Sequence, residues 1–200
     1  DAAFINPVSS RERAQEILKQ EGISQNNKPL FGVNVTSYID GWLHKTEKVA
    51  DRSAFVPMLA ECINKAKEKS NNAFQAVIFS THPMDEKCVY QLAELTNSKT
   101  IVNSKYLSHD IQAVMRECEL FMGLRFHSLV LSTAVGVPII GLLYAFKCRG
   151  FMRLLNTPEY GVELADIQPE MLSNLIVKAW GERKDIAKKQ QIMIDELKEG

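Results

Sequence analysis

The sequence predicts an α/β fold in which one parallel sheet is covered by helices on both faces. Short apolar segments alternate with longer segments whose apolar residues recur at helical spacing, and this alternation favours a parallel sheet with crossover helices. Segments such as PIIGLL (138–143) are apolar throughout, which is typical of strands buried on both faces. The 200 residues are 46% hydrophobic, which is enough for one core.

The expected strands are short and rich in β-branched or aromatic residues. They lie at 30–39, 74–81, 99–103, 119–123 and 138–143. The expected helices have apolar positions three and four residues apart. They lie at 50–70, 84–98, 108–118, 126–135, 148–155 and 169–200. Strands and helices therefore alternate from residue 30 onward, as in a Rossmann-like lobe.

Glycine, proline and capping residues indicate where several of these elements bend, start or stop. Gly32 suits a strand that passes close to a neighbouring side chain, and Pro57 predicts a bend or a late start in its helix. Ser108 is the expected N-cap of the helix that it opens. Gly136, with Pro138 shortly after it, should end the helix that precedes it.

The chain divides into three parts on this interpretation. Residues 1–29 form an interdomain segment with a leading helix, and 30–168 form a Rossmann-like C-terminal lobe. Residues 169–200 form C-terminal helices that pack on the lobe, and Gly181 either divides them or lies within one helix. The chain opens with DAAFINPVSS rather than an initiating Met, so we expect it to be a piece of a longer protein.

Composition narrows the class of partner. Lys and Arg total 24, as do Asp and Glu, so no overall charge favours nucleic acid. No apolar run reaches the roughly 18 residues of a spanning helix, since the longest candidate, 128–146, is interrupted by polar residues, glycine and proline. The four cysteines form no CxxC pair, which favours reduced thiols in a cytoplasmic protein over a disulfide framework or a metal site. They are Cys62, Cys88, Cys118 and Cys148.

Arg125 and His127 precede an apolar segment at a position where parallel α/β proteins bind ligands. Gly123 is the expected end of one strand, so both side chains fall in the following turn and the first turn of the next helix. Free backbone N–H groups and the positive end of the helix dipole lie there too. An arginine fork grips a carboxylate or phosphate, and an imidazole exchanges a proton near neutral pH. The alternative is a surface charge beside a partly buried histidine.

A second observation favours an anion site. No Asp or Glu occurs from Leu120 to Pro158. Arg125 and Lys147 fall at the carboxyl ends of successive strands, so they are expected to face one cleft. The alternative is a basic surface helix with scattered charges. The cations of the acid-free span are Arg125, Lys147, Arg149 and Arg153.

Two weaker candidates follow other strands. The segment STHPMDE (80–86) presents His82 and Asp85 at the same sheet edge, either as a substrate-binding loop or as a capped helix start. Asn34 closes the segment FGVN and either points into a ligand site or satisfies backbone groups. We expect His82 and Asn34 to help bind the substrate.

The segment CELFMGLRFHSLVLSTAVGVPIIGLLYAFK (118–147) resembles the polysaccharide pyruvyl transferase family. The family has a Gly-x-Arg-x-His core, a helix of small residues, a Gly-x-Pro turn, an apolar strand, and then Tyr and Lys. FGVNV (31–35) looks like the strand that opens the family's C-terminal domain, and DAAF (1–4) looks like the end of its N-terminal domain. The matching positions are Gly123, Arg125, His127, Gly136, Pro138, Tyr144 and Lys147.

The resemblance implies the second lobe of a two-lobed, glycosyltransferase-B-like fold, with the active site between the lobes. It implies transfer of pyruvate from phosphoenolpyruvate, the donor substrate, to a sugar hydroxyl, without a cofactor or metal. Arg125 and Lys147 would bind the donor together with N–H groups near Phe126 and His127, and His127 would protonate its methylene carbon. The partners would be a glycan or lipid-linked saccharide acceptor, a membrane surface nearby and the missing N-terminal lobe.

Two alternatives remain open. A nucleotide-sugar glycosyltransferase of the same gross fold commonly uses a carboxylate on the ribose hydroxyls, and none lies between residues 120 and 158. A non-catalytic glycan- or anion-binding domain is the other alternative. Many family members carry an acidic residue directly after the Tyr, whereas this chain has Ala145, so a degenerate member would also fit.

Overall fold

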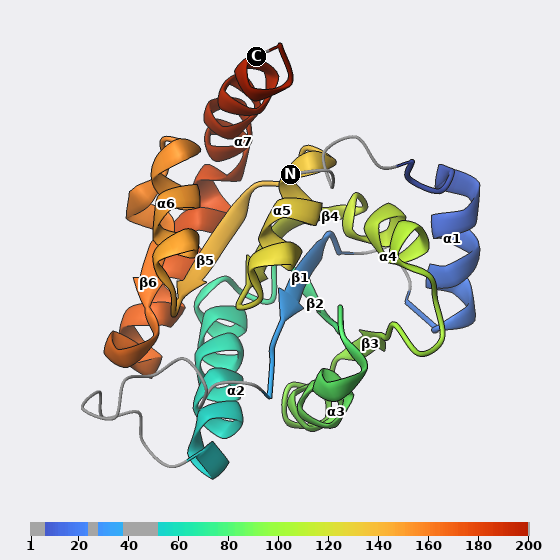
Figure 1. Cartoon of the computed structure of the whole chain (residues 1–200). Helices are drawn as coiled ribbons and strands as arrows, with labels where there is room; N and C mark the ends of the chain where they lie inside the picture. Colours follow the sequence, from blue (N-terminus) through green and yellow to red (C-terminus); the bar gives the residue numbers. More distant parts are fainter. Residues whose placement is uncertain (1–6, 24–27, 38–51, 200) are drawn as a thin grey trace.

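The computed structural model describes residues 7–23, 28–37 and 52–199, and it contains one parallel six-stranded sheet (Figure 1). The strands are β1 (Leu30–Asn34), β2 (Gln75–Phe79), β3 (Lys99–Ile101), β4 (Cys118–Gly123), β5 (Ile139–Leu143) and β6 (Gly161–Glu163). The α-helices are α1 (Arg11–Gln20), α2 (Arg52–Lys69), α3 (Glu86–Leu95), α4 (Ser108–Met115), α5 (Phe126–Ala134), α6 (Phe146–Leu154) and α7 (Pro169–Glu199). Among the described residues, the short 3-10 turns are η2 (Pro83–Asp85), η3 (Pro158–Tyr160) and η4 (Leu164–Asp166). The predicted α/β class with a parallel sheet is confirmed.

The strand order is β3-β2-β1-β4-β5-β6, so the direction of winding reverses between β1 and β4. Asn34, the last residue of β1, pairs with Phe79 at the end of β2 and with Gly123 at the end of β4. In open parallel sheets, ligands bind beyond the carboxyl ends of the strands where the winding reverses. The turns that follow β1, β2 and β4 therefore define the region in which a site is expected.

Helices cover both faces of the sheet. Every residue of β1 and of β5 is buried, although successive side chains point to opposite faces. Helix α2 packs on α3 and α7, while α4 packs on α1 and α5 (Figure 1). The continuous apolar strands expected from the sequence are therefore explained by burial on both sides.

Several element boundaries differ from the sequence-based expectation. The first strand ends at Asn34 rather than at 39, and residues 38 and 39 lie outside the described part of the chain. Helix α6 begins at Phe146 instead of 148. Strand β6 was not expected from the sequence, and its three residues become a strand by pairing with β5. Ser108 is not an N-cap, because the cap is Leu107, without a side-chain hydrogen bond, and Ser108 is the first helical residue.

Some of the effects expected of glycine and proline on the helices and strands are found in the structure, and others are not. Gly136 ends α5 with a φ of +81°, a left-handed conformation that favours glycine, and this confirms the stop signal. A Cβ at Gly32 would lie 2.4 Å from the Phe121 ring, which confirms the close neighbour. Pro57 lies inside α2 and does not delay its start, and α7 runs through Gly181 as one helix of 31 residues. Within the part of the chain that the structure describes, no helix combines the length and apolar character needed to cross a membrane.

Candidate functional site

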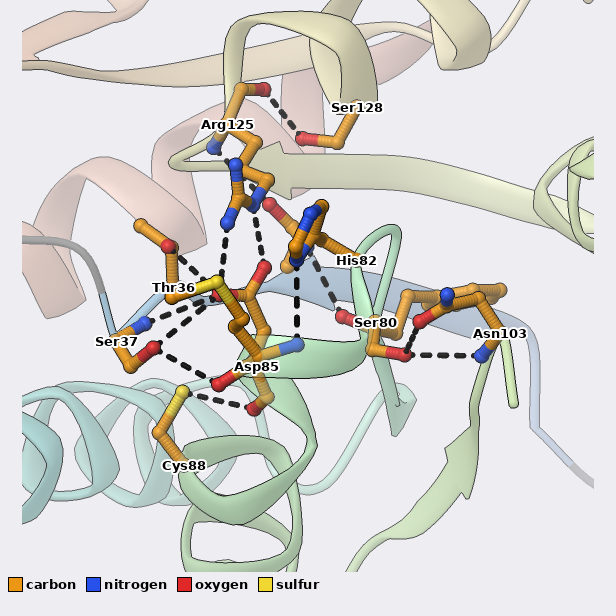
Figure 2. Close-up of polar contacts among 12 residues, drawn as sticks. Thr36, Ser37, Ser80, His82, Asp85, Cys88, Asn103, Arg125 and Ser128 are labelled. Carbon is orange, nitrogen blue, oxygen red and sulfur yellow. Dashed lines mark hydrogen bonds and ion pairs between the residues drawn. The ribbon is translucent and has the colours of Figure 1, made fainter.

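Helix α5 starts in direct contact with the end of β4, and this contact positions Arg125 at the sheet edge. A Cβ at Gly123 would lie 2.6 Å from Ser128 Oγ and 2.7 Å from Leu129 Cδ2, so only glycine allows this approach. Arg125 is the N-cap residue of α5, with an extended backbone, and its carbonyl accepts a 2.7 Å hydrogen bond from Ser128 Oγ (Figure 2). The predicted position of Arg125 in the strand–helix turn is confirmed.

Asn34 connects three strand ends through its buried amide. Its Nδ2 donates to the Phe79 carbonyl at 3.0 Å, and its Oδ1 accepts from the Arg125 backbone N–H at 3.0 Å. Because Asn34 is fully buried, its amide satisfies backbone groups, the second of the two roles considered from the sequence. Its contribution to the site is to hold the Arg125 backbone in place.

Arg125 forms an ion pair with Asp85, which follows β2 in the neighbouring turn (Figure 2). Its Nη2 donates to Asp85 Oδ1 at 3.0 Å, and its Nε donates to Oδ2. Asp85 Oδ1 also accepts from Thr36 Oγ1 at 2.8 Å and from the Ser37 backbone N–H at 3.2 Å. The Asp85 side chain is fully buried, while that of Arg125 is 19% exposed.

The ion pair between Arg125 and Asp85 contradicts the expectation of a purely cationic pocket. The absence of acidic residues from 120 to 158 suggested a purely cationic pocket, but the fold brings an acid from outside that span to Arg125. Arg149 is likewise paired with Glu163, which lies at the end of β6, with 2.5 Å between Nε and Oε1. Two of the four cations in the acid-free span therefore have carboxylate partners.

The two predicted histidines have different surroundings. His82 is exposed, and its Nδ1 accepts from the Met84 backbone N–H at 3.2 Å, so it caps the turn η2 (Figure 2). This is the capped start that the sequence left as one of two interpretations. His127 is exposed in the first turn of α5, with its ring centroid 5.9 Å from that of Phe126.

The first turns of α5 and α6 meet at Phe126. Lys147 is exposed, and its Nζ lies 5.1 Å from the centroid of the Phe126 ring. The same ring packs edge-on against Phe151 with 5.6 Å between centroids. Neither helix has an acidic residue in its first turn or a side-chain cap, so both N-termini can attract an anion. The structure thus brings Lys147 beside Phe126, the residue that follows Arg125, and the single cleft expected for Arg125 and Lys147 stays a prediction.

Tyr144, between β5 and α6, lies at the same sheet edge. Burial raises its pKa to about 12, and the nearby Cys148 thiol adds to the shift. The raised pKa keeps the phenol protonated into the alkaline range. The sequence signal for Tyr144 was its place in the pyruvyl transferase pattern, whereas nothing in the sequence singled out Thr36 or Ser37.

Among the described residues, no cluster of three or more His, Cys, Asp or Glu side chains could hold a metal ion.

Comparison with known proteins finds solved structures of the same fold and a distant, partial match in sequence. No family model matches the chain. Over 107 residues the chain is 27% identical to the amylovoran biosynthesis protein AmsJ of Erwinia amylovora, a match that covers 52% of this chain and 25% of AmsJ.

Solved structures of two glycosyltransferases have the same fold. One is a glycosyl transferase family 9 protein from Veillonella parvula, with a TM-score of 0.53 and 18% identity. The other is the ADP-heptose LPS heptosyltransferase II of E. coli, with a TM-score of 0.56 and 12% identity. Each match covers 86% of this chain and 53% of the other, so the chain spans about half the length of each protein. The chain thus has the glycosyltransferase-B-like fold that was predicted.

Proposed function

We propose that this chain is the donor-binding half of a polysaccharide pyruvyl transferase, which moves a pyruvyl group from phosphoenolpyruvate to a sugar hydroxyl. The observation that carries the proposal is the position of Arg125 and His127 at the start of α5, beside the reversal of strand order. The match to a protein of amylovoran biosynthesis and the transferase-like fold support a role in building a glycan. The acceptor is then a glycan or a lipid-linked saccharide, bound with the help of an N-terminal lobe.

Three kinds of protein group would bind the phosphoenolpyruvate anion: a guanidinium, backbone N–H groups and a lysine ammonium. Arg125 offers the guanidinium edge that does not face Asp85, and α5 offers the backbone N–H groups of its first turn. Lys147 adds an exposed positive charge beside the Phe126 ring. Since Asp85 offsets much of the charge of Arg125, directed hydrogen bonds contribute more to this site than net charge does.

His127 would act as the general acid. Its proton goes to the methylene carbon of phosphoenolpyruvate, and the neighbouring carbon becomes an electrophile that a sugar hydroxyl attacks. A new carbon–oxygen bond forms and the first hydroxyl gives up its proton. A second hydroxyl then attacks the same carbon, the bond from that carbon to the phosphate oxygen breaks, and the second hydroxyl proton leaves with the phosphate as the ketal closes. Proton transfer of this kind contributes about 10²–10⁴-fold to a rate. The reaction needs no cofactor or metal, and the four buried, free thiols suit the cytoplasm.

A second candidate is a nucleotide-sugar glycosyltransferase. The likeness to a heptosyltransferase favours it, since that protein has the same fold. Against it, Asp85 is bound to Arg125 and Glu163 to Arg149, so neither carboxylate is available to bind ribose hydroxyls without first breaking an ion pair. A domain that binds a glycan without catalysis remains the third candidate because of Ala145.

The test is phosphate release from phosphoenolpyruvate in the presence of acceptor glycan, with the full-length protein. We expect His127→Ala and Arg125→Ala to lower turnover at least about 100-fold. His109→Ala and Arg153→Ala, which remove exposed side chains of the same kind from α4 and α6, should leave it unchanged. Unchanged turnover in both site variants would contradict the assignment. Transfer from a nucleotide sugar without any response to phosphoenolpyruvate would favour the second candidate.

A further inference from the structure

We propose that Asp85 is a positioning residue of this site, which acts through Arg125 and makes no contact with the donor. Asp85 holds one edge of the Arg125 guanidinium so that the opposite edge faces the donor anion. The inference rests on the proposed function, because it requires that Arg125 binds a donor anion.

The contacts of Asp85 identify a group that orients another side chain. Both carboxylate oxygens accept from the Arg125 guanidinium, one from Nε and the other from Nη2 at 3.0 Å. Two parallel bonds to a carboxylate fix the plane of a guanidinium as well as its position. Asp85 is itself held by Thr36 Oγ1 at 2.8 Å and by the Ser37 backbone N–H at 3.2 Å (Figure 2). Its carboxylate is therefore constrained from two sides.

Burial separates the roles of the two residues. The Asp85 side chain is 0% exposed, so a ligand that arrives at the sheet edge cannot reach it. The Arg125 side chain is 19% exposed and offers a surface to the ligand. A guanidinium carries five N–H donors, and the bonds to Asp85 use Nε and one donor of Nη2. Nη1 and the second N–H of Nη2 are the donors that the two bonds to Asp85 do not use.

The pair joins three turns that are far apart in sequence. Asp85 follows β2, Arg125 follows β4, and Thr36 and Ser37 follow β1, which lies between those two strands. Asn34 holds the Arg125 backbone while Asp85 holds its side chain, so both ends of Arg125 are fixed before a donor binds. Misplacing a binding group by about 1 Å can cost about 10²-fold in rate, so the loss of Asp85 should affect donor use strongly.

The test is a double-mutant cycle between Asp85 and Arg125 in the full-length protein. KM for phosphoenolpyruvate, kcat, and the Kd values of phosphoenolpyruvate and inorganic phosphate are measured for each variant, corrected for the folded fraction. Asp85→Asn keeps the shape but removes the charge, and Asp85→Glu keeps the charge but displaces it. We expect each to weaken donor binding, to lower kcat/KM for phosphoenolpyruvate about 100-fold, and to have no further effect when Arg125 is already alanine.

Control variants distinguish positioning from loss of a buried ion pair. Asp110→Asn removes a carboxylate of α4 that binds Arg13 and Ser9, and it should leave donor binding unchanged. Thr36→Val removes one hydrogen bond to Asp85 but keeps the ion pair, and we expect donor binding about threefold to tenfold weaker, with recovery in Thr36→Ser. Thr36→Val and Thr36→Ser decide the question if the Asp85 variants do not fold.

The outcomes separate this inference from the proposed function. If the wild type releases no phosphate from phosphoenolpyruvate, the proposed function fails. The double-mutant cycle is then calculated from the Kd values of inorganic phosphate alone. Independent, multiplicative effects of Asp85→Asn and Arg125→Ala would overturn the inference. It would also be overturned if Asp85→Glu, or Thr36→Val where the Asp85 variants do not fold, bound the donor as the wild type does.

Discussion

The segments that follow β4 and β5 each contain a cation, but only the first cation is held by hydrogen bonds. After β4, Arg125 is held at its backbone by Asn34 and at its guanidinium by Asp85. After β5, Lys147 lies in the first turn of α6, is exposed, and contacts only the face of Phe126 among the described interactions. A fixed arginine specifies where an anion sits, whereas a mobile lysine contributes charge with little geometry. Two cations that look equivalent in sequence therefore have different physical roles.

The largest expected difference between the two turns concerns folding stability. Arg125→Ala leaves the Asp85 carboxylate buried without its partner, so we expect a loss of about 3–5 kcal/mol in the free energy of unfolding. Lys147→Ala removes an exposed cation–π contact and should cost less than about 1 kcal/mol. Urea denaturation at neutral pH measures both values. Similar losses would show that Arg125 is no more tightly held than Lys147.

Glycine substitutions test how tightly α5 and α6 are packed. Gly123→Ala would place a Cβ 2.6 Å from Ser128 Oγ, and the resulting shift of α5 should cost about 1–3 kcal/mol. A Cβ at Gly150 in α6 meets nothing within 4 Å, so Gly150→Ala should stabilise the helix by about 0.5–1 kcal/mol. Thermal denaturation of both variants gives the two signs. If Gly123→Ala were neutral, the close contact of β4 with α5 would not constrain the site.

Alkaline pH should affect the β5–α6 turn through Tyr144. Its folded pKa is raised to about 12 from an ordinary value near 10. The folded state keeps the phenol protonated, so this stabilisation is complete below pH 10 and declines as the pH rises from about 10 to about 12. Tyr144→Phe should remove that part of the decline, whereas Tyr90→Phe, which changes an exposed ring, should not. Parallel curves of unfolding free energy against pH for wild type and Tyr144→Phe would contradict the shift.

The smallest expected effect concerns the charge of Lys147. Lys147→Ala should raise KM for phosphoenolpyruvate about twofold to fivefold at low ionic strength, because exposed charge interactions are weak. The difference should fall as salt is added, since the Debye length shortens to about 8 Å at 0.15 M. A salt-independent loss of 100-fold would mean that Lys147 is as tightly positioned as Arg125.

Local patterns predicted most of the scaffold. Strands β1 and β5 are buried along their whole length, and β2 and β4 are buried except at Gln75 and Glu119. Gly136 ends α5 by its positive φ. Strand β6 could not be predicted, because three residues, GVE, become a strand only by pairing with β5. Gly181 and Pro57 were ambiguous for a similar reason, since packing of α2 and α7 against each other outweighs local helix propensity.

The candidate site also has features that local sequence predicted and features that depend on long-range packing. The sequence alone determined that Arg125 and His127 lie in a strand–helix turn, because a glycine-ended apolar run followed by a helical pattern is a local signal. Only the tertiary structure decided that Asp85 partners Arg125 and that Asn34 holds its backbone. Asp85 and Arg125 are 40 residues apart and become neighbours because β2 and β4 lie on either side of β1. Strand order sets which turns meet, and it depends on long-range packing, so the spacing of charges along the chain could not reveal which cation is held and which is mobile.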